Sequence, residues 1–591
     1  MTVPASPSRA ASRATSRDST AAPVRARIAP RWHRPEAPDG ALVGTLVDAL
    51  KLPPMVCELL AARGYADPED AKRFLRPRLE QLHAPLAMLG MDAAVDRLSR
   101  AIRGGEVILV HGDYDVDGIC STTIMVRVIR HLGGKAVPFL PHRMTDGYDL
   151  GDAGVRGAIE AGAKVVLTCD CGTSAHEAID RLTAQGIDVI VSDHHLPSRP
   201  VPSCLAVLNP RQPGCDYPDK DLCAAGVAFK IATALLQAFG ANENVALHLL
   251  DLVALATIAD VAPLRGENRI LVRFGLKLMA ESRHPGLQAL MDAAGLDRQA
   301  LTAGRVGFIL APRLNAAGRI GHAMRGVDLL LTQDQGEANR IARDLEEMNR
   351  ARQELDRATL DAARRMADRL DLDETWGIVL GAEGWHPGVI GIVASRLVED
   401  FARPVMMVAF EKGIGKGSGR SISAFDLHAG LTACQDLLVR YGGHRAAAGI
   451  TIQAERLAAF AERFNGVARA KLTADDLVPR VRVDVEIPLE EVTPDLEALL
   501  RHFEPFGVGN PAPVLSSRGV RLATTPRTVG QGGLKLQLAR SGGMLEAIGW
   551  GMGDLARTLS PHAPLDIAYR LERDSYGGVS RLVARLSDVR A

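Results

Sequence analysis

Short apolar segments alternate with helical stretches between residues 106 and 191, and this alternation restricts the fold more than any other feature of the chain. Val107–Val110, Ala136–Leu140, Lys164–Thr168 and Ile187–Val191 have the length and composition of buried strands, and Ser121–Leu132 has helical spacing. Strands that alternate with helices form a parallel sheet with helices on both faces. Such sheets bind their ligands beyond the carboxyl ends of the strands. We therefore expect an α/β fold with a functional site at one edge of this sheet.

Acidic and histidine residues occupy the positions that follow these strands. The set comprises His111, Asp113, Asp115 and Asp117 after the first strand, Asp170 after the third, Asp193, His194 and His195 after the fourth, and Asp260 at the end of the apolar helical stretch Leu252–Ala259. Any one of these residues, taken alone, is better explained as a turn or helix-cap residue. Together, several carboxylates in one crevice repel one another strongly at low dielectric, and divalent cations remove that repulsion.

The donor types indicate which cation and which chemistry to expect. Carboxylate oxygens with one or two imidazoles suit manganese or magnesium better than a thiolate-bound zinc. Two such ions about 4 Å apart can bind one phosphodiester, activate water and stabilise the leaving oxygen. The sequence therefore predicts metal-dependent hydrolysis of a phosphate ester. The glycine-rich segment 413–418 lacks the spacing of a triphosphate-binding loop, and we expect a flexible loop there.

Composition sets broader limits. A chain of 591 residues is expected to form roughly three to five domains. Lys+Arg and Asp+Glu number 70 each, so any phosphate-binding surface must be a local patch. No apolar run approaches the length that a membrane helix needs. The eight cysteines show no zinc or disulfide pattern, which favours a reducing, cytoplasmic location.

The motifs as a set resemble those of a known superfamily. Asp115-x-Asp117, Asp170, Asp193-His194-His195 and Asp260, in this order, are similar to the four motifs of the DHH phosphoesterases, and within them to the RecJ single-stranded-DNA exonucleases. The resemblance extends over roughly residues 40–591. It implies an N-terminal helical region at 39–104, a parallel-sheet DHH catalytic domain at 105–335, a long linking helix at 336–372, a second α/β DHH-associated domain for substrate binding at 373–475, and an OB-like β-barrel for nucleic-acid binding at 476–591. Residues 1–38 depart from the family pattern, and their composition, rich in Arg, Ser, Ala and Pro, predicts a disordered basic tail.

The resemblance also implies a role for each metal-site residue. Asp115 would bind one ion, Asp117 the other, and Asp170 would bridge them, with His194 and Asp260 completing the second ion's ligands. The catalytic residues would be His195, which contacts the scissile phosphate or the leaving group, together with Asp113 and Asp193. His111 stands where related pyrophosphatases carry a ligand, and it is either a ligand or a packing residue.

Further similar segments imply contacts with nucleic acid. These are Arg313, Asn315 and Arg319 in a loop, Arg396 after a glycine-containing turn, and the second-domain loop residues Ser418, Arg420, Gly442, Gly443 and His444. Each arginine could equally be a solvated basic residue. In the barrel, Phe503, Phe506 and Trp550 are candidates for base stacking or for core packing.

The implied function is 5′-to-3′ removal of 5′-mononucleotides from single-stranded DNA in repair and recombination, with two manganese or magnesium ions. A monomer is expected, with a single-strand-binding protein and a helicase as partners. One alternative is a DHH phosphodiesterase acting on short oligoribonucleotides or cyclic dinucleotides, and the N-terminal helices and the barrel argue against it. Another is a non-catalytic DNA-binding replication scaffold, which should have lost ligands that this chain keeps.

Overall fold

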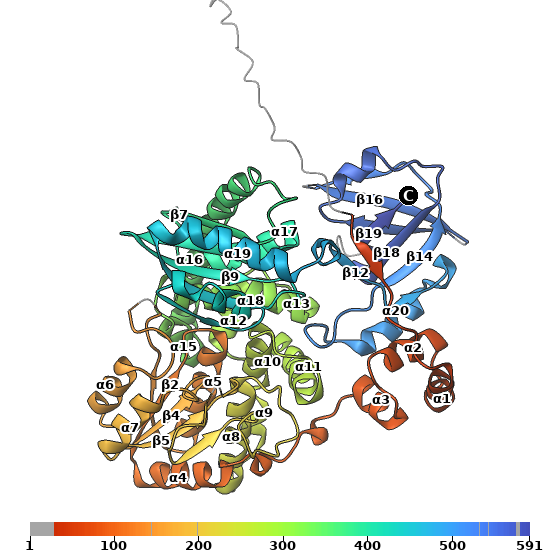
Figure 1. Cartoon of the computed structure of the whole chain (residues 1–591). Helices are drawn as coiled ribbons and strands as arrows, with labels where there is room; N and C mark the ends of the chain where they lie inside the picture. The colour runs from red at the N-terminus through yellow and green to blue at the C-terminus, as the bar shows by residue number, and fades with distance from the viewer. Residues whose placement is uncertain (1–28, 144, 198, 531, 542, 575–579) are drawn as a thin grey trace, which may run out of the picture.

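The computed structural model describes residues 29–143, 145–197, 199–530, 532–541, 543–574 and 580–591. Most of the predicted basic tail, residues 1–28, lies outside these ranges. Figure 1 shows one lobe in orange and yellow, a second lobe in green and cyan above it, and a blue β-barrel at the side of both. The first lobe is here called the catalytic lobe, after the DHH catalytic domain that the resemblance implies at residues 105–335.

The catalytic lobe contains the predicted parallel sheet. Its five strands pair in the order β3-β2-β4-β5-β6, and every pair is parallel. The strands are β2 (Val107–Gly112), β3 (Lys135–Phe139), β4 (Val165–Cys169), β5 (Asp188–Ser192) and β6 (Ala206–Leu208). The first four confirm the strands expected from the sequence, while β6 has three residues and was not predicted.

Helices cover both faces of this sheet because successive strand residues point to opposite sides. Ile108 and Val110 pack with α5 (Val116–His131), α8 (Ala224–Ala238) and α10 (Leu250–Ala259). Leu109 points to the other face and packs with α6 (Asp152–Glu160) and α7 (His176–Ala184). The lobe continues through α11 (Gly266–Ala280), α12 (Pro285–Ala293), α14 (Ala311–Ile320) and α15 (Met324–Leu331).

A single long helix joins the two lobes. Helix α16 spans Gln335–Ala367, and the Asp334 carboxylate caps it by accepting from Glu337 N at 2.6 Å. Its first half packs on α12 and α14, and its second half packs on α17 (Ile390–Phe401) of the second lobe. This arrangement agrees with the long linking helix expected at residues 336–372.

The second lobe is built on a mixed sheet with the order β10-β11-β9-β8-β7, in which β7 and β8 are parallel. Its strands are β7 (Ile378–Glu383), β8 (Val405–Glu411), β9 (Ile414–Arg420), β10 (Arg440–Gly443) and β11 (Ala447–Gln453), and α17 and α19 (Leu457–Lys471) pack on it. The expectation of a flexible loop at 413–418 is wrong, since residues 414–420 form β9. A Cβ at Gly417 would collide with Ile450 Cγ1, so glycine lets neighbouring side chains fill this strand's surface.

The C-terminal barrel contains seven strands in the order β13-β14-β18-β19-β17-β16-β15. They are β13 (Val485–Glu486), β14 (Leu515–Val520), β15 (Arg527–Val529), β16 (Gly533–Arg540), β17 (Gly543–Gly549), β18 (Leu565–Asp574) and β19 (Arg581–Arg590). This confirms the expected OB-like barrel.

The predicted N-terminal helical region is divided between two bodies. Helices α1 (Gly40–Leu50), α2 (Pro54–Ala62) and α3 (Pro68–Leu75) share a hydrophobic core with the barrel, whereas α4 (Met91–Gly104) packs into the catalytic lobe. The end of the predicted tail is also ordered: β1 (Arg31–His33) pairs in parallel with β12 (Arg480–Arg482), and Trp32 Nε1 donates to Asp588 Oδ2 at 2.7 Å. These long-range contacts have no local sequence pattern.

Within the described residues, no single helix has both the length and the apolar composition needed to cross a membrane. One bent pair, Gly40–Leu50 with Pro54–Ala62, meets that test on length and composition alone.

Candidate metal centre

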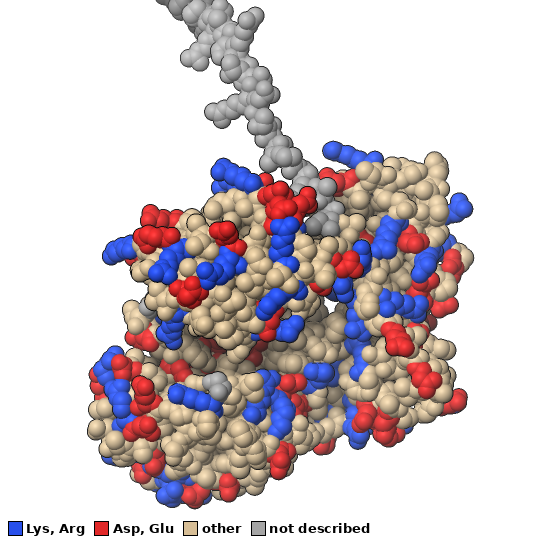
Figure 2. Space-filling view, in the orientation of Figure 1, with Lys and Arg blue, Asp and Glu red and all other residues tan. Residues whose placement is uncertain are grey.

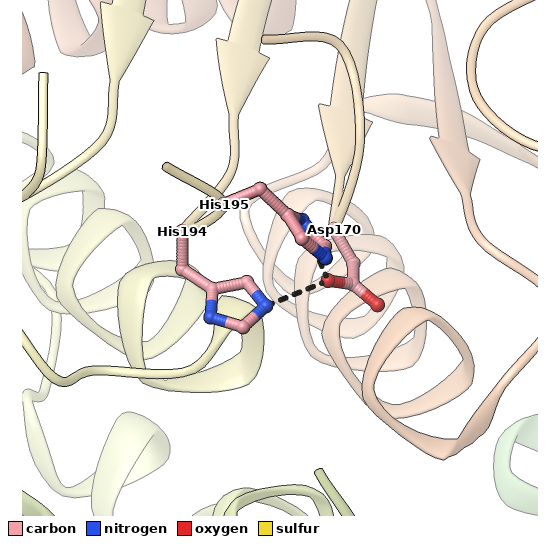
Figure 3. A group of neighbouring side chains, drawn as sticks. All are labelled: Asp170, His194 and His195. Carbon is pink, nitrogen blue, oxygen red and sulfur yellow. Dashed lines mark hydrogen bonds and ion pairs between the residues drawn. The ribbon is translucent and has the colours of Figure 1, made fainter. Parts of the chain in front are cut away.

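The acids and histidines at the strand ends converge on one site. Three groups have ligand atoms that lie within 4.8 Å of one another. The groups are Asp113, Asp115 and Asp170; Asp117, His194 and Asp260; and Asp170, His194 and His195. Asp170 and His194 each belong to two groups, so the three form one continuous cluster. Figure 3 shows the rings of His194 and His195 beside the Asp170 carboxylate, and His194 Nε2 lies 3.1 Å from Asp170 Oδ1.

Two of these acids are also fixed by helix N-termini. Asp115 caps α5, because its Oδ1 accepts from Asp117 N at 2.9 Å and from Gly118 N at 3.2 Å. The Asp117 carboxylate accepts from Ala224 N and Ala225 N at the start of α8, both at 2.8 Å. The helix-cap explanation of these acids is therefore correct for Asp115 and compatible with metal binding, since a carboxylate has more than two acceptor positions.

Asp193 has a different environment from the other acids. Its Oδ1 accepts from His194 N and from the ring nitrogen Nδ1 of His195 at 2.8 Å, and its Oδ2 accepts from Thr173 N. Burial opposes its ionisation, but the hydrogen bond and charge of His195 outweigh burial and hold its pKa below the ordinary value. Asp193 belongs to none of the three groups. Its geometry is that of a residue that orients His195.

The same pair sets the charge of His195. Burial lowers the pKa of this imidazole, but the hydrogen bond to Asp193 and its charge raise it to about 9. Burial instead dominates at His194 and lowers its pKa to about 3, so this ring is neutral and able to ligate a cation. The two adjacent histidines are thus suited to different tasks.

The remaining carboxylates have raised pKa values, as expected for acids that are buried close together at a cation site. Burial, followed by repulsion from Asp115, raises the pKa of Asp113 to about 8 and that of Asp117 to about 7. Burial and the charge of Asp117 raise the pKa of Asp260 to about 8, and they also raise that of Asp170. Among the described residues, Asp113 Oδ1 is buried without a hydrogen-bond partner. A cluster of this kind is stabilised when divalent cations replace the protons.

His111 lies outside the three groups. Its ring is fully buried, stacks on Phe139 with 5.4 Å between centroids, and places Nδ1 3.5 Å from Cys171 Sγ. Burial lowers its pKa to about 4. A Cβ at Gly154 would lie 2.7 Å from the ring, so the backbone of α6 closes over it. The geometry favours the packing alternative, and a role as a ligand stays a prediction.

The cluster of acids and histidines opens into a pocket of about 340 Å³. A separate pocket of about 380 Å³ does not include these residues. The pocket next to the cluster is lined by the acidic and histidine residues Asp113, Asp115, Asp170, His195 and Asp260, and also by Tyr114, Arg143, Tyr148, Asn315 and Arg319. Arg143 and Tyr148 were missed from the sequence. Both residues follow β3 at the same edge of the sheet, and this position could have identified them from the sequence. Tyr148 OH lies 3.4 Å from His195 Nδ1.

The segment that carries Arg313, Asn315 and Arg319 is helix α14, not the expected loop. Pro312 is the second residue of α14, which continues directly from the π-helical turn Val306–Leu310. A Cβ at Gly318 would collide with Tyr114 O, so glycine allows α14 to approach the metal-site turn closely.

The three contacts predicted on α14 have different surroundings. Asn315 and Arg319 reach the pocket, whereas Arg313 Nε is bound to Glu346 Oε2 at 2.5 Å on α16. Burial and the neighbouring arginines lower the pKa of Arg319 to about 10, which leaves the group charged at neutral pH.

The predicted contacts of the second lobe lie in three places. Ser418 and Arg420 are side by side on β9, where Arg420 Nη1 donates to Ser418 Oγ at 3.2 Å next to Gly391 of α17. Arg396 pairs with Asp356 of α16 at 3.2 Å. Gly442, Gly443 and His444 lie at the edge strand β10 or just after it, and their contact with substrate stays a prediction. Figure 2 shows the molecule hollowed between the two lobes, with Lys and Arg side chains beside the hollow.

The barrel aromatics are not equivalent. Phe503 is fully buried and packs edge-on against Phe74, so it belongs to the core. Phe506 is partly buried against the same core, and Trp550 is 58% exposed. Of the three, Trp550 is the one whose ring is available for stacking on a base.

Comparison with known proteins agrees with this architecture. Residues 107–257 match the DHH family, N-terminal domain, residues 375–470 match the DHHA1 domain, and residues 483–588 match the RecJ OB domain. The single-stranded-DNA-specific exonuclease RecJ of Bacillus subtilis is 37% identical over 540 residues, which are 91% of this chain and 68% of that protein. The chain belongs to the RecJ family.

Two further relatives of this RecJ family member extend the likeness. The single-stranded-DNA-specific exonuclease RecJ of Escherichia coli is 35% identical over 551 residues, covering 89% of this chain and 94% of that protein. The crystal structure of RecJ in complex with Mn²⁺ from Thermus thermophilus superposes with a TM-score of 0.81 at 35% identity, covering 95% of this chain and 79% of that one. The oxygen and imidazole donors of the cluster in this RecJ chain fit Mn²⁺ or Mg²⁺.

Proposed function

We propose that this protein hydrolyses single-stranded DNA from a free 5′ end and releases 5′-mononucleotides with two Mn²⁺ or Mg²⁺ ions. The observation that carries the proposal is the continuous cluster in which Asp170 and His194 are each shared between two groups of potential ligands. Sharing of this kind suits two adjacent cations on one phosphodiester. Membership of the RecJ family supports single-stranded DNA as the substrate, and the 5′-to-3′ direction rests on that family resemblance.

We assign the metal ligands by the grouping of their atoms. Asp113, Asp115 and Asp170 would hold one ion, and Asp117, His194 and Asp260 the other, with Asp170 close to both. When bound, these cations supply charge stabilisation of the phosphate and activation of water. In this assignment Asp113 is a ligand, in addition to the catalytic role that the family resemblance implies for it.

The other residues of the pocket act on the substrate. Arg319 and Arg143 line the same pocket as the acids and would offer guanidinium donors to phosphate oxygens. His195, kept protonated by Asp193, is placed to donate a hydrogen bond to the scissile phosphate or a proton to the leaving oxygen. Ser418 and Arg420 of the second lobe would bind the strand farther along, and Trp550 would stack on a base at the barrel.

We also propose the setting in which the protein works. Its eight free cysteines suit a reducing cytoplasm, and the protein would act as a monomer. An exonuclease for single strands requires unwound DNA, so a helicase and a single-strand-binding protein are the expected partners.

The two alternatives receive less support. An enzyme for dinucleotides or cyclic dinucleotides has no evident use for a barrel that packs with three additional helices. A non-catalytic scaffold has no need for a cluster of buried acids, which destabilises a protein that binds no cation.

Digestion of end-labelled DNA tests the proposal. Single-stranded and duplex oligonucleotides of one sequence, and a length series beginning at a dinucleotide, are labelled at the 5′ or the 3′ end and incubated with Mn²⁺ or EDTA. We expect the 5′ label to appear at once as a mononucleotide, only from single strands and only with Mn²⁺. A preference for the dinucleotide, or early release of the 3′ label, would contradict the proposal.

A further inference from the structure

The residue that follows Asp260 has an unusual backbone. Val261 has a φ of 61°, a left-handed conformation that β-branched residues rarely adopt. Val261 N donates to Ile258 O at 3.2 Å and Ala262 N donates to Thr257 O at 3.1 Å. These are the hydrogen bonds of a Schellman motif, in which glycine usually occupies the position of Val261. Such a conformation persists where surrounding contacts hold it.

Val261 itself is exposed, but the barrel contacts the residues that follow it through the turn Phe506–Asn510, here called the barrel turn. Leu264 N donates to Val508 O at 2.7 Å, and the Leu264 side chain is 2% exposed. A Cβ at Gly507 would lie 2.7 Å from Leu264 Cδ1, and a Cβ at Gly509 would lie 3.0 Å from Pro263 Cβ. The barrel turn therefore lies directly on the segment that continues from Asp260.

The barrel turn is itself firmly held. Asn510 is 2% exposed, and its Nδ2 donates to Phe503 O at 2.7 Å and to Pro505 O at 2.8 Å. Gly507 and Asn510 exchange backbone hydrogen bonds of 2.9 and 3.1 Å. The guanidinium of Arg63, from α2, contacts Asn510 Oδ1. The barrel turn is therefore expected to move together with the barrel.

The catalytic lobe holds the same segment from its other side. Asn268 Nδ2 donates to Pro263 O at 3.1 Å and to Asp221 O at 2.5 Å. The segment after Asp260 is therefore held between the barrel turn and the catalytic lobe. Asp260 stands at the start of this segment, and its Oδ2 lies 3.9 Å from His194 Nε2. The position of the segment therefore affects the geometry of the Asp117, His194 and Asp260 group.

We propose that the barrel turn is a positioning element for Asp260, acting through Val508 and Leu264, so that seating of the nucleic-acid-binding module completes the second metal position. This inference rests on the proposed metal-dependent activity and adds a route by which the barrel controls it. Residues that orient a ligand typically change metal affinity about 10- to 100-fold when they are altered.

The test measures Mn²⁺ binding by the metal-free full-length protein, with calorimetry for affinity and electron paramagnetic resonance for the coupled two-ion signal. In Gly509→Ala the added methyl group meets Pro263 at a φ of +73°. Gly519→Ala is the matched control, because Gly519 has a φ of +63° in the same barrel and a Cβ added there would have no atom within 4 Å. We expect the control to bind two ions as the wild type does. In Gly509→Ala one ion should bind normally and the other about 10- to 100-fold more weakly, with loss of the coupled signal.

A rescue variant separates positioning from general damage. Glycine accepts the left-handed conformation without strain. In Val261→Gly the backbone after Asp260 should therefore keep its conformation without support from the barrel turn. Adding Val261→Gly to Gly509→Ala should restore the second ion, and kcat on single-stranded DNA should follow while KM stays unchanged. Should Gly509→Ala fail to fold, Gly507→Ala presses on the flexible end of Leu264 and should produce the same loss.

The outcomes are distinct. Two normally bound ions in Gly509→Ala or Gly507→Ala, with folding intact, would overturn the positioning role and leave the proposed nuclease untouched. Failure of the wild type to bind any Mn²⁺ would overturn the proposed function itself, and the positioning role with it.

Discussion

His194 Nε2 lies 3.1 Å from Asp170 Oδ1, although the two residues come from different strand ends. Because burial keeps the imidazole neutral, His194 could donate an electron pair to a cation, and Asp170 would be close enough to help hold it. We predict that His194→Ala lowers the affinity for one of two Mn²⁺ ions by more than about 100-fold, since loss of an orienting partner alone costs up to that factor. Calorimetric titration checks this. Two ions of unchanged affinity would exclude His194 as a ligand.

The buried carboxylates predict how stability depends on pH. The pKa of Asp113 and Asp260 rises from 3.8 to about 8, and that of Asp117 rises to about 7. The folded, metal-free protein therefore keeps protons that the unfolded chain releases, so the free energy of unfolding decreases as pH rises from about 4 to about 8. Each such proton contributes about 1.4 kcal/mol per pH unit.

Thermal denaturation at a series of pH values measures this effect. In EDTA, Tm should fall between about pH 6 and about pH 8.5, and added Mn²⁺ should raise Tm most at the higher pH, where fewer protons compete. A Tm gain from Mn²⁺ that is equal at both pH values would contradict the prediction.

Asp193→Asn tests the control of His195 by its neighbour. Without the carboxylate, burial dominates, and the pKa of His195 should fall from about 9 to 6.5 or lower. At about pH 8 we expect kcat to decrease on the order of 10²- to 10⁴-fold with little change in KM, as for loss of a positioned proton donor. Histidine NMR titration of the metal-free protein, with His195→Gln to assign the signal, measures the pKa. An unchanged pKa would refute the pairing.

Salt dependence distinguishes the two arginines of α14. Arg319 faces the metal pocket, so Arg319→Ala should weaken single-stranded DNA binding and reduce the slope of log K against log salt by about 0.7 for each phosphate that the side chain neutralises. Arg313 is paired with Glu346, and Arg313→Ala is the matched control with an unchanged slope. Fluorescence anisotropy in EDTA measures both. A reduced slope in Arg313→Ala would restore the role first inferred for it.

The sequence was sufficient for the features that depend on local pattern. Apolar runs such as Val107–Val110 identify buried strands, and parallel strands bring their carboxyl ends to one edge, so Asp115, Asp170 and His194 could be placed together from the sequence alone. Asp260 could be added because it ends an apolar helix that had to pack on the same sheet.

Features that depend on long-range packing could not be found in this way. Arg313, Asn315 and Arg319 were expected in a loop, but α14 forms there. The glycines of β9 suggested flexibility, whereas they make room for side chains of neighbouring strands. The union of α1–α3 with the barrel joins segments at opposite ends of the chain, and no local spacing reports it.

We propose that Asp170 joins two cation positions on which hydrolysis depends. The most direct measurement is digestion of 5′-labelled single-stranded DNA by Asp170→Ala in Mn²⁺. Asp96→Ala, which removes an exposed carboxylate paired with Arg100, serves as the matched control. We predict mononucleotide release by the wild type and by Asp96→Ala, and release no faster than the EDTA background by Asp170→Ala. Digestion by Asp170→Ala at the wild-type rate would contradict the claim.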